Sequence, residues 1–187
     1  VTVRVIAGKY KRRLLKAVPG QNTRPTTDRN KENLFNLIGP YFDGGVCLDL
    51  FGGSGGLGIE ALSRGMVKLY SVDVDYRAFQ TIKENLTTLG INDACVWKMS
   101  AYKALERLET MGEKLDLVLL DPPYGKGHSQ RVLEILSQSP LLNPHARIVV
   151  EENQTVHLAD GYGNIRKIKA VNYGLTTLHI YEMEEDE

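Results

Sequence analysis

Two short segments of the sequence carry residues suited to ligand binding and catalysis. The first runs from Asp49 to Gly58 and reads Asp-Leu-Phe-Gly-Gly-Ser-Gly-Gly-Leu-Gly. Glycines let the backbone turn sharply and let a ligand approach the main chain. Residues 53–58 match the pattern G-x-G-x-x-G, and Asp73 follows twenty residues after Gly53. A carboxylate at this spacing is placed to accept hydrogen bonds from a ribose diol.

Asp49 distinguishes two classes of cofactor for this segment. Its carboxylate stands four residues before Gly53, where it would repel a pyrophosphate and attract an ammonium group. S-adenosylmethionine has a cationic amino acid end and no phosphate. The segment therefore favours S-adenosylmethionine, with a nicotinamide dinucleotide as the main alternative. A glycine turn that binds no ligand is the third interpretation.

The second segment is Asp121-Pro122-Pro123-Tyr124. The two prolines fix φ and remove two N–H donors, which stiffens the loop. The Asp121 carboxylate and the Pro122 carbonyl could then both accept hydrogen bonds from the exocyclic NH2 group of a nucleobase. Tyr124 offers a flat face for base stacking, worth about 1–3 kcal/mol. The alternative is a rigid strand-to-loop turn with a buried tyrosine.

Apolar periodicity predicts the elements that position these segments. We expect five apolar strands, at residues 46–50, 69–73, 94–99, 115–120 and 148–151. We expect helices between them, at residues 57–63 and 76–89, in a segment ending near residue 108, and at residues 130–137. Apolar strands joined by helices indicate a parallel sheet covered on both faces, which binds ligands at the carboxyl ends of its strands. Residues 164–171 and 176–183 predict an antiparallel hairpin at one edge, giving a mostly parallel seven-stranded sheet.

The N-terminal region has a different pattern. Residues 3–7 and 13–18 predict two short strands around a turn, and residues 28–38 predict a helix that Gly39-Pro40 ends. We therefore divide the chain into an N-terminal β-hairpin arm of residues 1–25 and a domain of residues 26–187.

The charge is distributed unevenly along the chain. The net charge is zero, yet residues 1–31 contain nine Lys or Arg and a single acidic residue, Asp28. A basic arm on an acidic body favours a polyanionic partner such as RNA. The residues that we expect to contact RNA phosphates are Arg4, Lys9, Lys11, Arg12, Arg13 and Arg24. The alternatives are an ordinary solvated surface and, for Arg24, a structural salt bridge.

The composition is that of an ordinary globular domain. Hydrophobic residues make up 42% and charged residues 25% of the 187 residues. There is no apolar run of 18 residues for a membrane span and no recognisable secretory signal. The two cysteines, Cys47 and Cys95, are too few for a disulfide framework or a zinc site. We expect a monomeric, cytoplasmic, metal-free protein.

Together, residues 49–58, Asp73 and residues 121–124 resemble motif I, the ribose-binding acid and the catalytic motif of class I S-adenosylmethionine-dependent amino-methyltransferases. Over residues 4–181 the chain resembles, more narrowly, the bacterial family that methylates guanine N2 in 16S ribosomal RNA. The stretches that carry this resemblance are Arg4-Val-Ile-Ala-Gly8, Thr23-Arg-Pro-Thr-Thr-Asp-Arg29, Glu60-Ala-Leu-Ser-Arg-Gly65, Glu84-Asn-Leu86, and Tyr173-Gly174 with Thr176. The chain departs from the family in having Gly52 and Gly56 where alanine is usual, and Ser100 where an acid is common.

The resemblance implies an α/β, Rossmann-like class I methyltransferase fold with S-adenosylmethionine as cofactor. It places the cofactor on Asp49, Phe51, Gly53, Gly55, Asp73, Ser100 and Ala101. It places the catalytic site on Asp121, Pro122, Pro123 and Tyr124. The implied partner is 16S rRNA or an assembly intermediate of the small ribosomal subunit. Three alternatives remain: adenine-N6 methylation of a nucleic acid, an NAD-dependent oxidoreductase that leaves residues 121–124 without a role, and a non-catalytic RNA-binding protein.

Overall fold

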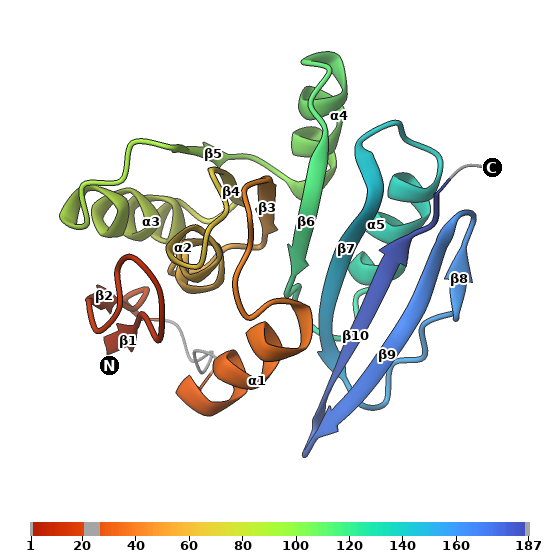
Figure 1. The fold of residues 1–187 in the computed structure, drawn as a ribbon, viewed down its shortest axis with the longest axis horizontal. Coiled ribbons are helices and arrows are strands. Elements are labelled where there is room, and N and C mark those ends of the chain that lie inside the picture. The colour runs from red at the N-terminus through yellow and green to blue at the C-terminus, as the bar shows by residue number, and fades with distance from the viewer. Residues whose placement is uncertain (1, 21–26, 186–187) are drawn as a thin grey trace.

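A computed structural model describes residues 2–20 and 27–185. Eight strands in these ranges form one mixed sheet with the order β5-β4-β3-β6-β7-β10-β9-β8 (Figure 1). The parallel strands are β3 (Val46–Leu50), β4 (Lys68–Asp73), β5 (Ala94–Lys98), β6 (Leu115–Leu120) and β7 (Leu142–Asn153). The antiparallel strands are β8 (Gly161–Tyr162), β9 (Ile165–Tyr173) and β10 (Thr176–Met183).

The helices cover both faces of the sheet. One face packs against α4 (Ala101–Thr110) and α5 (His128–Ser137). The other face packs against α1 (Asp28–Ile38), α2 (Gly56–Ser63) and α3 (Tyr76–Thr88). Because side chains alternate along a strand, β6 sends Val118 and Leu120 into the first core and Leu117 and Leu119 into the second. This double burial explains why the sequence of β6 is almost wholly apolar.

The structure confirms the predicted α/β class, with its parallel core and antiparallel C-terminal strands, and differs in two details. An eighth strand, the two-residue β8, extends the edge of the sheet, and it is too short to leave a periodic pattern in the sequence. β7 begins at Leu142 rather than at the predicted 148. Its first half contains Asn143, Pro144 and His145, which interrupt the apolar run by which the strand was recognised. Among the described residues, no helix is long and apolar enough to cross a membrane.

The N-terminal hairpin, β1 (Thr2–Arg4) and β2 (Leu14–Lys16), packs closely against α2 and α3. The Glu60 carboxylate on α2 accepts hydrogen bonds from the backbone N–H groups of Ile6 and Ala7, at 2.9 and 3.1 Å. Gly8 has φ +90°, and a Cβ there would lie 1.9 Å from the Ser63 carbonyl oxygen, so this contact requires glycine. The hairpin is therefore fixed in position relative to the sheet.

The strands of this hairpin are shorter than the predicted ranges 3–7 and 13–18. The division into two parts at residue 25 falls in residues 21–26, outside the described residues, and stays a prediction.

Candidate active site

The carboxyl ends of the parallel strands bring together three aspartates, Asp49, Asp73 and Asp121. β3 pairs with β4 on one side and with β6 on the other. The chain adds β4 and β5 on one side of β3 and then crosses to add β6 and β7 on the other, so the topological switch point of the sheet lies between β3 and β6. Open parallel sheets bind ligands in the crevice that forms outside such a switch point. Both segments singled out in the sequence follow strands that end at this crevice.

The glycine-rich loop between β3 and α2 exposes its backbone to the crevice. Phe51, Gly53 and Gly55 all have positive φ, at 60°, 59° and 84°. This conformation favours glycine, and a Cβ at Gly53 would meet nothing within 4 Å. Space beside the main chain at Gly53 is what a ligand needs to approach it.

Asp49 is a buried carboxylate, 2% exposed, beneath this loop. Its Oδ2 accepts a hydrogen bond from the backbone N–H of Gly58 at 3.1 Å. Burial, with a smaller contribution from the Asp73 carboxylate, raises the pKa of Asp49 to about 8, while the Gly58 N–H acts in the opposite direction. A cation bound beside Asp49 would favour its ionised form.

Asp73 ends β4 and holds the turn that follows it. Its Oδ2 accepts a hydrogen bond from the N–H of Gly53 at 3.0 Å, and its Oδ1 accepts one from the N–H of Asp75 at 2.9 Å. A carboxylate has about four lone-pair positions, so both oxygens can still accept from other donors. The half-buried Asp73 can thus brace the glycine loop and accept hydrogen bonds from a diol at the same time.

α4 begins at Ala101, directly after Ser100, close to the carboxyl ends of the parallel strands. The hydroxyl of Ser100 caps the helix by accepting a hydrogen bond from the N–H of Lys103 at 3.2 Å, and Ala101 is buried. The structure therefore gives Ser100 a helix-capping role, and a contact with the cofactor stays a prediction.

The sequence did not predict a cluster of ring-bearing side chains beside Phe51, formed by Tyr102 and His128 together with Arg131. The rings of Phe51 and His128 lie 5.2 Å apart, and the Tyr102 hydroxyl lies 2.6 Å from Nδ1 of His128. Arg131 stacks on Tyr102, with its guanidinium carbon 4.2 Å from the ring centre. These residues come from the glycine loop, α4 and α5, and no spacing in the sequence indicates that they meet.

The loop after β6 presents Asp121 and Tyr124 to the crevice. Pro122 is buried and Pro123 exposed, whereas Tyr124 is 45% exposed, with its hydroxyl 3.4 Å from Oγ1 of Thr176. The alternative of a buried tyrosine is therefore wrong. Burial raises the pKa of Asp121 well above its ordinary value, and the nearby carboxylates of Glu151 and Asp49 raise it further.

Several carboxylates thus gather where β3, β6 and β7 end. In the part of the chain that the structure describes, no set of three or more His, Cys, Asp or Glu side chains is arranged to hold a metal ion. The arrangement instead offers hydrogen-bond acceptors, beside the flat face of Tyr124, to a ligand that carries donors.

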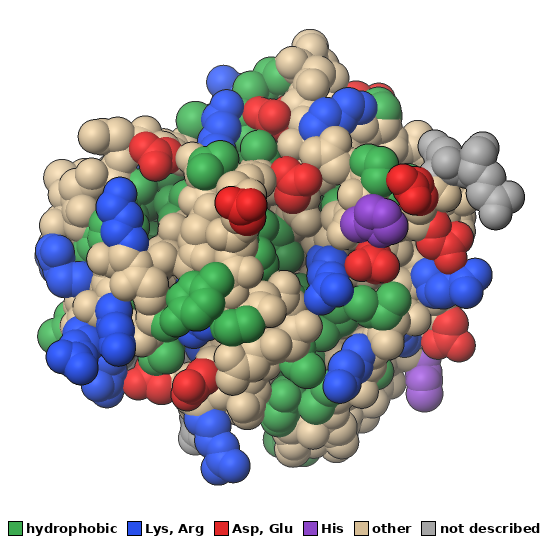
Figure 2. Space-filling view, viewed as in Figure 1, with side chains coloured by type: hydrophobic (Ala, Val, Ile, Leu, Met, Phe, Trp, Pro, Cys, Tyr) green, Lys and Arg blue, Asp and Glu red, His purple; other side chains and the backbone are tan. Residues whose placement is uncertain are grey.

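The basic side chains of the N-terminal hairpin lie on the surface, where Figure 2 shows Lys and Arg side chains gathered on the side of the molecule that the hairpin occupies. Lys9, Lys11 and Arg12 are exposed. Arg4 forms an ion pair with Asp28 at 3.2 Å, and Arg13 donates a hydrogen bond to the carbonyl of Thr88. The predicted contact at position 24 lies outside the described residues.

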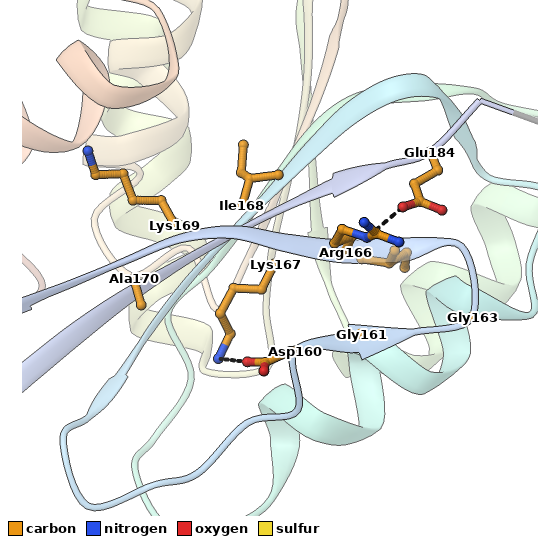
Figure 3. Close-up of a pocket in the computed structure, with 10 residues that line it drawn as sticks. Asp160, Gly161, Gly163, Arg166, Lys167, Ile168, Lys169, Ala170 and Glu184 are labelled. Atoms are coloured by element: carbon orange, nitrogen blue, oxygen red, sulfur yellow. Dashed lines mark ion pairs between the residues drawn. The ribbon is translucent and has the colours of Figure 1, made fainter.

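A hollow that the sequence did not predict lies apart from this site. It has a volume of about 610 Å³ and is lined mainly by β8 and β9 (Figure 3). Its charged groups are largely paired with one another, Arg166 with Glu184 at 2.7 Å and Lys167 with Asp160 at 3.7 Å. It lies toward the start of β9, whereas the end of β9 is level with the carboxyl end of β7, with β10 between the two strands.

Comparison with known proteins identifies the family. A family model described as "Conserved hypothetical protein 95" matches residues 3–182. The chain belongs to this family. Its relatives include "Putative rRNA methyltransferase YlbH" of Bacillus subtilis, 45% identical over 181 residues that cover 96% of this chain and 98% of that protein. "Ribosomal RNA small subunit methyltransferase D" of Haemophilus influenzae is 34% identical over 182 residues, covering 96% and 93%.

A solved structure titled "Putative methyltransferase yhhF from Escherichia coli" has the same fold. It superposes with a TM-score of 0.84 at 30% sequence identity and covers all of both chains. Family and fold together confirm the predicted class I S-adenosylmethionine-dependent methyltransferase and its cofactor, rather than the nicotinamide alternative.

Proposed function

We propose that the protein transfers a methyl group from S-adenosylmethionine to ribosomal RNA, and that its target is the N2 amine of a guanine in 16S rRNA. The observation that carries this proposal is the position of Asp121 and the exposed Tyr124 beside the glycine loop at the switch point of the sheet. Relatives that span nearly the whole chain and are named as rRNA methyltransferases support the RNA substrate.

The crevice fits S-adenosylmethionine. Asp49 provides a buried carboxylate whose ionised form would pair with the cationic amino acid end. The open backbone at Gly53 admits the ligand, and Asp73 has lone pairs free for the ribose hydroxyls. Phe51, Gly55, Ser100 and Ala101 complete the proposed cofactor site. When bound, the cofactor supplies a methyl carbon that is open to in-line attack by an amine.

Asp121 and the Pro122 carbonyl are proposed to act on the attacking amine. The lone pair of guanine N2 is delocalised into the ring, so the free amine is a weak nucleophile. Hydrogen bonds from its NH2 group to Asp121 and Pro122 strengthen as positive charge develops on nitrogen, which favours the transition state over the bound substrate. The same hydrogen bonds favour the ionised form of Asp121, against the burial that raises its pKa.

The surface around the crevice is proposed to hold the RNA. A paired base cannot reach the acceptors, so the target must be unpaired or extruded before it stacks on Tyr124, with Pro123 beside it. Contacts between phosphates and the basic side chains of residues 4–24 would hold the RNA independently of its sequence. We propose that 16S rRNA, or an assembly intermediate of the small subunit, meets the protein as a cytoplasmic monomer.

Single-turnover methyl transfer with Asp121 variants tests the proposal. We expect Asp121→Ala to bind S-adenosylmethionine normally and to lower kcat about a hundredfold or more, the loss typical of one preorganised transition-state contact. Asp121→Asn keeps an acceptor oxygen and should retain more activity. Asp93→Ala, which removes an exposed carboxylate before β5, serves as the matched control. A stable Asp121→Ala protein with near-normal turnover would refute the mechanism, and N6-methyladenosine as the product would favour the adenine alternative.

A further inference from the structure

The mechanism above leaves the half-buried carboxylate of Glu151 without a role. Glu151 follows Val150, which pairs with Leu120, so Glu151 and Asp121 stand side by side at the ends of adjacent parallel strands. The Oε2 atom of Glu151 is buried and has no hydrogen-bond partner among the described residues. A buried polar atom without a partner costs stability, and such an atom at a ligand crevice indicates a contact that the ligand makes.

The next residue along β7 shows what a structural carboxylate looks like at this place. Glu152 points to the opposite face of the sheet, where its Oε2 accepts a hydrogen bond from the Ser129 hydroxyl at 2.7 Å. Its Oε1 accepts one from the N–H of Asn153 at 3.3 Å. Glu152 is thus satisfied within the protein, whereas Glu151 is not.

Glu151 also lines a small cavity that adjoins the Asp121 loop. The cavity has a volume of about 10 Å³, and its walls include Asn30 of α1, Tyr173 and Thr176. Thr176 is the residue that the Tyr124 hydroxyl approaches to 3.4 Å, so the hydroxyl end of Tyr124 lies close to one wall of this cavity. Because the space holds about one water-sized group, it accommodates an edge atom of a base rather than a ring.

We propose that Glu151 determines the specificity for guanine by accepting a hydrogen bond from guanine N1–H while Asp121 accepts one from the N2 amine. This inference rests on the proposed function. N1–H and N2–H2 are adjacent donors on the Watson–Crick edge of guanine, and two adjacent carboxylates are complementary to them. Adenine has a bare acceptor at N1, which a carboxylate repels. The Asn30 amide, in the same cavity, can donate to O6.

The electrostatics of the crevice agree with this arrangement. Burial raises the pKa of Glu151, and the negative charge of Glu151 helps to raise the pKa of Asp121. Two neighbouring carboxylates therefore resist being ionised together unless a ligand donates hydrogen bonds to them. Two adjacent N–H donors remove that obstacle, whereas a base that presents one donor and one acceptor does not.

The test uses the full chain and a synthetic RNA in which the nucleotide methylated by the wild-type protein is either guanosine or 2-aminopurine riboside. The analogue keeps the 2-amino group but has a bare acceptor at N1 and lacks O6. The change in preference between the wild-type protein and the Glu151 variants therefore isolates the contact at N1. We expect the wild-type protein to prefer guanosine by about a hundredfold or more in kcat/KM, because a site built to pair with an N–H rejects an analogue that lacks it. Glu151→Gln carries an amide that can donate to the bare N1, so the preference should fall at least about tenfold.

Two further variants complete the test of the role of Glu151. Glu151→Ala removes both the acceptor and the repulsion, so it should also lower the preference, and the test does not depend on one variant folding. Glu134→Gln changes an exposed carboxylate on α5 and should keep the wild-type preference. A preference within twofold of wild type in both Glu151 variants would overturn the role of Glu151 alone. A wild-type product other than N2-methylguanosine would overturn the proposed function itself.

Discussion

Asp49→Asn is expected to remove a pH dependence from S-adenosylmethionine binding. In the ligand-free protein the pKa of Asp49 is about 8, mainly because of burial. At pH 7 about a tenth of the molecules therefore have an ionised Asp49. If the ammonium group of the ligand requires the carboxylate, ionising it costs about 1.4 kcal/mol at pH 7. The affinity should then be about tenfold weaker at pH 6 than at pH 7, with nearly one proton released per ligand bound. In this range the ammonium group of the ligand stays protonated.

Calorimetry in buffers of different ionisation enthalpy measures both the affinity and the proton release. The variant is neutral, nearly the same size as Asp49, and keeps an oxygen for the Gly58 N–H. We expect it to bind more weakly than the wild-type protein at pH 7, with little pH dependence between pH 6 and pH 7 and no proton release. An affinity of the wild-type protein that is the same at pH 6 and at pH 7 would refute the placement of the ammonium group beside Asp49.

The same carboxylate links pH to the stability of the ligand-free protein. The pKa of Asp49 is higher in the folded than in the unfolded state, so the unfolded chain binds fewer protons between the two pKa values. The contribution of Asp49 to the free energy of unfolding is therefore present at acid pH. It is lost as the pH rises from about 4 to about 8, by up to about 1.4 kcal/mol per pH unit. Urea denaturation across this range should show a smaller decline in Asp49→Asn.

Three further variants test other parts of the structure. Asp73→Ala should weaken S-adenosylmethionine binding by about 1–3 kcal/mol in calorimetry, because charge-assisted hydrogen bonds to the ribose are lost; unchanged affinity would exclude this role. Glu60→Gln should lower the free energy of unfolding in urea by about 3–5 kcal/mol, because a fully buried carboxylate between Lys31 (3.7 Å) and Arg64 (2.8 Å) loses its charge. A loss below about 1 kcal/mol would contradict this account. The double variant Arg12→Glu with Arg13→Glu should weaken RNA binding and flatten its salt dependence in filter-binding titrations, without changing the affinity for the cofactor. An unchanged salt dependence would show that the hairpin is an ordinary solvated surface.

The sequence predicts the core of the fold well because burial on both faces leaves a direct pattern. The almost wholly apolar run at residues 115–120 predicts a central strand, and β6 occupies this range. Turn chemistry is equally direct at Gly55, since the left-handed backbone that begins α2 favours glycine. Short elements without a periodic pattern, such as β8, are not predicted.

Contacts between distant parts of the chain could not be predicted from the sequence. Glu60 has the residue type of a solvent-facing helix position, yet it is fully buried because Ile6 and Ala7, more than fifty residues away, donate hydrogen bonds to it. Glu151 and Glu152 form an ordinary acidic pair in the sequence. Their environments differ because α1 covers the face of β7 that carries Glu151 and α5 covers the face that carries Glu152. This arrangement depends on the tertiary structure.

Methylation of small ribosomal subunits that lack the modification tests the central claim most directly. Subunits from a strain without the gene are incubated with the purified protein and methyl-labelled S-adenosylmethionine, and the digested rRNA is analysed by mass spectrometry. We predict labelled N2-methylguanosine at a single position of the 16S rRNA, and its absence with Asp121→Ala. Label in N6-methyladenosine, or no label in RNA although the protein binds the cofactor, would contradict the proposed function.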